Sequence, residues 1–178
     1  MKQINKYIVE RLHINKDIDS YNYHPKTRDE LIELINELIE ERGNDANLND
    51  IDTSKITDMN SLFDRSEFNG DISNWNVSNV YDMSYMFMQS KFNGDISNWD
   101  VSKVEDMGHM FAYSSFNGDI SEWNVSNVKT MISMFYDSKF TGENGDISKW
   151  DVSNAKNNMY YMFIKSPLEK NPPKWYKN

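Results

Sequence analysis

The sequence predicts an α/β solenoid of about five 24-residue repeats, closed at its N-terminal end by an α-helical cap. Three observations predict it. First, apolar residues recur at a fixed period. Second, each period contains a short β-branched and aromatic stretch that is followed by methionines and phenylalanines at helical spacing. Third, one amphipathic helical pattern precedes the first period. A period of this length is typical of chains in which each unit buries its apolar face against the next unit.

The 24-residue period extends over most of the 178-residue chain. Tryptophans, methionines and phenylalanines all follow it in register, which chance does not explain. A degenerate first copy covers about residues 48–70, with Ile51 in the tryptophan position, and the fourth copy carries an insertion before Trp150. The residues in register are Met59, Met83, Met107 and Met131, Phe68, Phe92, Phe116 and Phe140, and Trp75, Trp99 and Trp123.

Within one repeat, the residue types predict a strand, a bend, a short helix and a turn. The β-branched and aromatic residues of 72–80 favour a short strand that ends in a tight corner. Met83, Met86 and Phe87 have the i, i+3, i+4 spacing of a helical turn with one inward face. Asn93-Gly94 favours positive φ and closes a turn. Paired strands would place equivalent tryptophans about 4.8 Å apart in a buried ladder.

The two ends of the chain have the composition of caps. Thr27 and Glu30 form a capping box before apolar residues at helical spacing, and Gly43 ends the pattern, so a helix is expected at about 27–42. This gives a helical cap over 1–44, a repeat region over 45–168 and a C-terminal tail over 169–178. Apolar residues within 4–12 fit a helix or a strand, and Trp175 is expected to fold back on the last repeat.

Charge and composition exclude several classes of function. The net charge is −9 with a pI of about 4.8, which argues against direct nucleic-acid binding. The chain has no cysteine and no apolar stretch long enough to span a membrane. Because no export signal or anchor is recognisable, a cytoplasmic protein is expected, with a phage-encoded protein acting in a host cell left open.

No residue pattern indicates catalysis, a cofactor or a metal, so an enzyme is not expected. The three histidines are far apart in the sequence, and His109 occupies a repeat position that holds tyrosine or serine elsewhere. The aspartates after Asn-Gly, such as Asp71 and Asp95, are interpreted as turn residues. One carboxylate per coil falls short of the six to eight oxygens that Ca²⁺ takes.

The repeat unit Ile-Ser-x-Trp-(Asp/Asn)-Val-Ser-x-Val-x-Asp-Met-x-x-Met-Phe-x-x-Ser-x-Phe-Asn-Gly-Asp resembles that of the BspA-like leucine-rich-repeat surface protein family, over residues 48–168. The resemblance implies a right-handed, leucine-rich-repeat-like coil that serves as an interaction scaffold rather than a catalyst. Many members of that family are secreted or lipid-anchored bacterial adhesins, and similar arrays occur in phages and mobile elements.

Differences between copies indicate where a partner would bind. Inward positions barely change, whereas several outward positions vary and are rich in tyrosine and methionine, which are enriched in recognition surfaces. The sequence therefore predicts a protein-protein interaction module, with packing between coils as the competing explanation for part of the set. The residues of this predicted face are Tyr81, Tyr85, Met88, His109, Tyr113, Tyr136 and Tyr161.

Two other functions remain open at this level. One is a small acidic inhibitor, encoded by a phage or mobile element, of a host nucleic-acid-binding enzyme. The other is a structural component of a virion or surface layer. The interaction module is expected to bind another protein, and self-association stays open.

Overall fold

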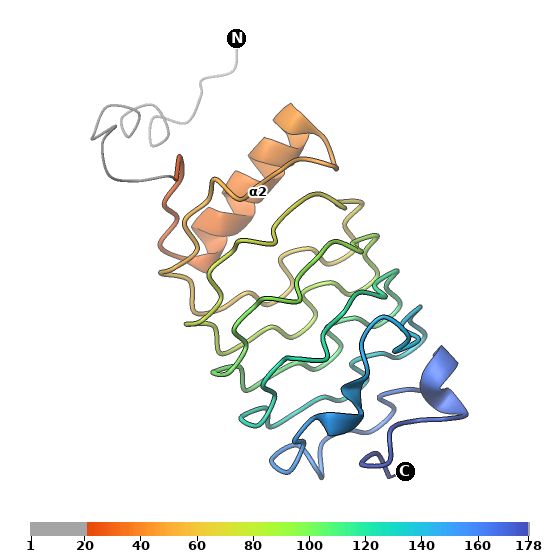
Figure 1. Ribbon diagram of the computed structural model, residues 1–178. Helices are drawn as coiled ribbons and strands as arrows, with labels where there is room; N and C mark the ends of the chain where they lie inside the picture. Colours follow the sequence, from red (N-terminus) through yellow and green to blue (C-terminus); the bar gives the residue numbers. More distant parts are fainter. Residues whose placement is uncertain (1–20, 178) are drawn as a thin grey trace.

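The computed structural model describes residues 21–177, and these residues form a stack of similar coils with a helix across one end (Figure 1). The element order is α2 (Arg28–Arg42), η1 (Ile147–Lys149) and η2 (Pro167–Glu169). The coils between α2 and η2 follow one another down the stack, and the C-terminal tail lies at the end opposite α2 (Figure 1). We call this stack, residues 46–166, the column.

The predicted α/β solenoid, with a strand, a bend and a helix in each repeat, is wrong. Residues 21–177 contain no sheet: the strand-like pairing between neighbouring coils is limited to isolated parallel bridges such as Asp58 to Asp82 and Asp82 to Asp106. No repeat contains an α-helix, and α2 is followed only by the two three-residue 3₁₀ turns. The strand, bend and helix of a leucine-rich-repeat-like right-handed coil are therefore absent from the described residues.

Each coil consists of successive hydrogen-bonded turns. In the segment expected as a strand, the Trp75 amide donates to the Ile72 carbonyl at 3.1 Å and the Val80 amide to Val77 at 2.9 Å. In the segment expected as a helix, a turn at 83–86 is followed by another at 87–90. The third residue of each of these two turns has φ near 60°, as in a type II turn. The apolar spacing that suggested a helix also fits consecutive turns, and positive φ excludes a right-handed helix.

Backbone amides alternate between bonds within a coil and bonds to the next coil. The amides of Met83, Tyr85 and Phe87 donate to carbonyls of the following coil, each at 2.9 Å. The amides between them donate back within their own coil, for example Met86 to Met83 at 3.3 Å. This alternation satisfies the buried backbone without a sheet, as buried amides and carbonyls require.

Aspartate and asparagine side chains form the corners of each coil. Asp71 Oδ1 accepts from the Ser73 amide at 3.0 Å, Asn76 Oδ1 from Ser78 at 3.1 Å, and Asp82 Oδ1 from Ser84 at 2.8 Å. These are Asx-turns, in which the side chain replaces a backbone acceptor. The recurrent aspartates are thus turn residues, as their position after Asn-Gly indicated.

The Asn-Gly pairs have a different role from the one expected. Gly94 does not have positive φ; instead, a Cβ atom there would lie 2.8 Å from the Phe92 ring, so only glycine fits. The asparagine next to it links coils, because the Asn93 amide donates to Asn69 Oδ1 at 2.7 Å and the Asn117 amide to Asn93 Oδ1 at 2.7 Å.

The interior contains the columns of apolar side chains that the repeat predicted. Trp75 and Trp99 stack with ring centroids 6.5 Å apart and planes 1° apart. Each indole also donates to a carbonyl of the preceding coil, Trp75 to Leu48 at 3.0 Å and Trp99 to Ile72 at 3.2 Å. The methionines and phenylalanines in register are fully buried, for example Met107. The indoles and thioethers therefore do face the axis of the column.

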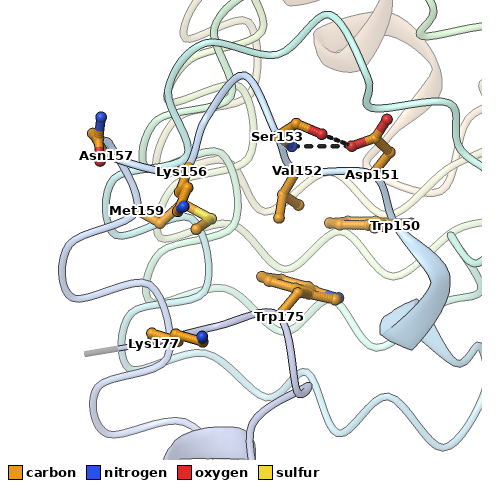
Figure 2. A pocket seen from close by; sticks show the side chains of 9 residues that line it. All are labelled: Trp150, Asp151, Val152, Ser153, Lys156, Asn157, Met159, Trp175 and Lys177. Carbon is orange, nitrogen blue, oxygen red and sulfur yellow. Dashed lines mark hydrogen bonds between the residues drawn. The ribbon is translucent and has the colours of Figure 1, made fainter.

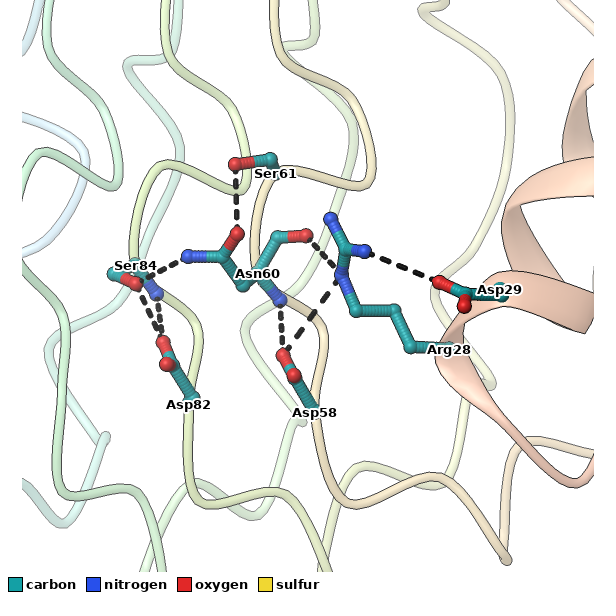
Figure 3. A network of polar contacts seen from close by, with 7 residues as sticks. All are labelled: Arg28, Asp29, Asp58, Asn60, Ser61, Asp82 and Ser84. Carbon is teal, nitrogen blue, oxygen red and sulfur yellow. Dashed lines mark hydrogen bonds and ion pairs between the residues drawn. The ribbon is translucent and has the colours of Figure 1, made fainter.

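Helix α2 covers the N-terminal end. Thr27 Oγ1 accepts from the Glu30 amide at 3.2 Å, and the Gly43 amide donates to Ile39 at 2.9 Å, so both predicted caps are present. Arg28 Nε reaches the Asn60 carbonyl of the first coil at 2.7 Å (Figure 3). The apolar face of α2 packs on the core through Leu31, Leu34, Ile35 and Leu38.

The tail partly covers the other end. Trp175 folds back as expected, with its ring centroid 6.4 Å from that of Trp150 and its indole donating to the Ile147 carbonyl at 2.9 Å.

The prediction for residues 4–12 lies outside the described residues, and the division of the chain at 44 and 168 remains a prediction. Among residues 21–177, no helix has the length and apolar character that crossing a membrane requires.

Candidate functional site

Two lines of non-glycine residues with positive φ run along one side of the column. We call them the first and second αL columns; their φ values lie between 50° and 60°. Each member is the third residue of a turn, so the same backbone geometry recurs while the side chain changes from coil to coil. The first column contains Ser61, Tyr85, His109, Ser133 and Tyr161, and the second Arg65, Gln89, Tyr113, Asp137 and Lys165.

Eight of these ten residues are of types that the left-handed conformation does not favour, His109 and Asp137 being the exceptions. A non-glycine residue in the left-handed region costs about 1–2 kcal/mol, and glycine or asparagine relieves much of this cost. None of the ten is glycine or asparagine. All five members of the second column are exposed, whereas the first ranges from exposed Tyr161 to buried Ser133.

One aromatic pair of the predicted face lies in the first αL column. The Tyr85 and His109 rings stack with centroids 4.8 Å apart and planes 8° apart. Burial lowers the pKa of His109 below its ordinary value, and the nearby Asp106 carboxylate opposes this shift. Burial also raises the pKa of Asp106, and the Asp82 carboxylate adds to that rise, while the Gly108 amide opposes it.

A second cluster spans the last three coils. Tyr113 and Tyr136 meet edge to face at 5.3 Å, and Lys165 Nζ lies 5.5 Å from the centre of the Tyr136 ring. Contact with Tyr136 is the main cause that raises the pKa of Lys165. A cation over an aromatic face is a favourable contact, and here it joins the fourth coil to the fifth.

The structure brings part of the predicted face together and leaves part apart. Tyr81, Tyr113 and Tyr161 are 51%, 48% and 64% exposed. Met88, His109 and Tyr136 are half-buried between coils, so packing accounts for part of their surface. Tyr81 lies in a separate line with Glu105 and Lys129, whose side chains pair at 2.7 Å. Within the described part of the chain, no ring contact joins Tyr81 or Tyr161 to the other members.

Sequence reasoning missed two features of the surface. Tyr160, beside Tyr161, is 62% exposed and was not assigned to the face. A cavity of about 460 Å³ lies at the C-terminal end of the column, between the last coil and the tail (Figure 2). The last coil supplies most of its lining, and the repeat pattern alone did not indicate it.

The described residues show no metal centre: among residues 21–177, no three histidine, aspartate or glutamate side chains are grouped so that they could hold an ion. The carboxylates of the corners accept hydrogen bonds from serine amides two residues on, as in Asp95 and Asp119.

Comparison with known proteins gives a family but no close relative. No curated protein and no solved structure matches the chain. One family model, described as "Mycoplasma protein of unknown function, DUF285", matches residues 33–143 and again 91–176, which together run from α2 to the tail. This is a family of BspA-like repeats, so the resemblance seen in the repeat unit holds at the level of the family. The chain therefore belongs to the DUF285 family of Mycoplasma proteins of unknown function.

Proposed function

We propose that this protein is a non-enzymatic protein-protein interaction module that binds a partner through the predicted face of seven residues. The observation that carries the proposal is the make-up of the two αL columns, which contain four of the seven residues and in which ten positions of left-handed backbone hold no glycine or asparagine. Where glycine would ease the backbone, the presence of a side chain is explained most simply by what that side chain contacts.

The types of side chain support a protein partner. Exposed tyrosines such as Tyr81 and Tyr113 offer a large contact area and a hydroxyl at a modest cost in conformational entropy. The coils beneath are held by inter-coil hydrogen bonds and stacked rings, so the face is ordered before binding. A pre-ordered face loses little entropy on association, which favours affinity.

The test is capture of partners from a native host extract with the full chain as bait. The variant Tyr81→Ala/Tyr85→Ala/Tyr113→Ala should lose the captured protein, because it removes three exposed rings. The matched control, Asn74→Ala/Asn98→Ala/Glu122→Ala, removes three exposed side chains from the same position of successive coils elsewhere and should retain it. Thermal unfolding checks that both variants are folded.

Salt separates the proposal from its competitor. Binding through the aromatic face should persist in about 1 M salt, where the Debye length is only about 3 Å. An acidic inhibitor bound to a basic nucleic-acid channel should be released under that condition. Full retention of the partner by a folded triple alanine variant would overturn the proposed face.

A further inference from the structure

The two ends of the column carry opposite charge. Helix α2 has six acidic residues and two arginines, a net charge of −4 over Arg28–Arg42. Residues 147–178 have six lysines and two acidic residues, a net charge of +4 in a chain whose total is −9. The acidic end is the one that α2 covers, and the basic end is the one that the tail covers (Figure 1).

The acidic charge of α2 faces away from the column. Glu33, Glu37, Glu40 and Glu41 are exposed, and their i, i+4, i+7, i+8 spacing places them on one stripe opposite the buried leucines. Both arginines of α2 are engaged elsewhere, Arg28 with the Asn60 carbonyl and Arg42 with Asp50 at 3.1 Å. Within residues 21–177, the four glutamates make no ion pair.

The basic end has an apolar cavity with a cationic rim. Trp150, Val152, Met159 and Trp175 line the cavity of about 460 Å³, and Lys156 and Lys177 lie at its exposed edge (Figure 2). Neither lysine forms an ion pair in the part of the chain that the structure describes. The one carboxylate of the lining, that of Asp151, accepts from the Ser153 amide at 3.1 Å.

The last coil also leaves backbone donors without acceptors. In the preceding coil, the amides of Met131, Ser133 and Phe135 donate to carbonyls of the last coil at 2.8–3.0 Å. The equivalent amides of the last coil, at 159, 161 and 163, have no hydrogen bond within the described residues. Only the fourth, Lys165, is satisfied, by the Glu169 carboxylate at 3.1 Å. Met159 and Phe163 are buried, so of these three amides that of exposed Tyr161 is the one that an acceptor from another chain can reach.

We propose that the basic C-terminal end binds the acidic outer stripe of α2 from a second copy, so that copies associate end to end. The rim lysines and the Tyr161 amide supply positive charge and a donor, and the glutamate stripe supplies exposed carboxylates that form no ion pair within residues 21–177. Because the two surfaces differ, the contact is heterologous and repeats from copy to copy. Six of the seven residues of the proposed partner face lie on earlier coils, and only Tyr161 belongs to the last coil, so this contact leaves the other six free.

The test is a charge exchange followed by sedimentation velocity at low ionic strength, using the full chain. The wild type should gain mass as its concentration rises, and about 1 M salt should reverse this. The variants Lys156→Glu/Lys177→Glu and Glu33→Lys/Glu37→Lys should each associate about tenfold more weakly or worse, because like charges then meet. Mixed in equal amounts, they should associate again, since each supplies the surface that the other lacks.

Controls carry the same charge changes on the sides of the column. Lys91→Glu/Lys139→Glu and Glu67→Lys/Glu122→Lys alter exposed residues and should associate like the wild type. Three results would overturn the proposal: a wild type that keeps the mass of one chain at every concentration, controls that weaken association equally, or a mixture of the exchanged variants, each folded by thermal unfolding, that fails to associate. None of these results bears on the aromatic face, which the capture experiment tests separately.

Discussion

The inward positions of the coils and the αL columns follow opposite rules, although they alternate along the same turns. Met83, Met107 and Met131 are the same residue in the same buried place in three coils. Two residues further along, Tyr85, His109 and Ser133 differ in size and chemistry while their φ values stay within 55–59°. The inward side chains and the corners therefore determine the path of the backbone, whereas the side chains of the αL columns do not.

Removal of an inward aromatic ring should have the largest effect on stability. Trp99→Ala should lower the free energy of unfolding by about 3–5 kcal/mol, because it opens a cavity and leaves the Ile72 carbonyl without its indole donor. Trp99→Phe keeps most of the volume and should cost less. Urea denaturation of both variants measures the two contributions, and a loss below about 1 kcal/mol in the alanine variant would contradict a tightly packed ladder.

A smaller effect of opposite sign is expected in the αL columns. Gln89 is exposed with φ of 56°, and its side chain forms no hydrogen bond within residues 21–177. Gln89→Gly should therefore be more stable than Gln89→Ala by about 1 kcal/mol, since glycine adopts this conformation without a Cβ clash. Equal stabilities of the two variants by urea denaturation would show that the columns carry no backbone strain.

The smallest effect is expected at the aspartates of the Asx-turns, which are neither inward residues nor members of the αL columns. Hydrogen bonds from the serine two residues on lower the pKa values of Asp71, Asp95 and Asp100. A carboxyl whose pKa is lower in the folded state stabilises the fold above its unfolded pKa of about 3.9 and loses that contribution as pH falls through the folded value. Burial raises the pKa of Asp106, so protonation of that residue has the opposite sign.

Replacement of these aspartates by asparagine tests the contribution of their charge to stability. Asp71→Asn/Asp95→Asn/Asp100→Asn keeps the Oδ1 acceptor, as Asn76 does naturally, and removes the titration. Stability near pH 7 should change little, while the loss between about pH 4 and pH 2 should be shallower than in the wild type. The measurement is the urea midpoint of unfolding across this pH range. Identical pH profiles for variant and wild type would show that the charge of these aspartates does not stabilise the fold.

Sequence reasoning predicted what depends on burial and missed what depends on backbone dihedrals. The period, the buried tryptophans and the helix after Thr27 follow from apolar spacing and capping residues, and the structure has them. The local geometry does not follow, because the spacing of Met83, Met86 and Phe87 fits a helix and a pair of turns equally well. No residue type at Tyr85 or Gln89 announces positive φ, so the turns could not be distinguished.

The same limit applies to the surface. Variation among copies identified exposed tyrosines such as Tyr113, but it could not distinguish them from half-buried Tyr136, whose ring a lysine from the next coil contacts. The charge difference between the ends was present in the sequence. Its meaning depended on knowing that α2 and the tail lie at opposite ends of one stack (Figure 1).

The alternating amide bonds have a consequence for how such a chain can change its length. Inner coils bond to the coil before and the coil after, and at every junction four equivalent amides, such as those of Met83, Tyr85, Phe87 and Gln89, donate to the next coil. Excision of residues 95–118 would join Gly94 to Asp119 and so restore the Gly-Asp pair that occurs at each junction between consecutive repeats, for example at 70–71. A shortened molecule should thus fold around the same two ends, and duplication of one unit should lengthen it without a new kind of contact.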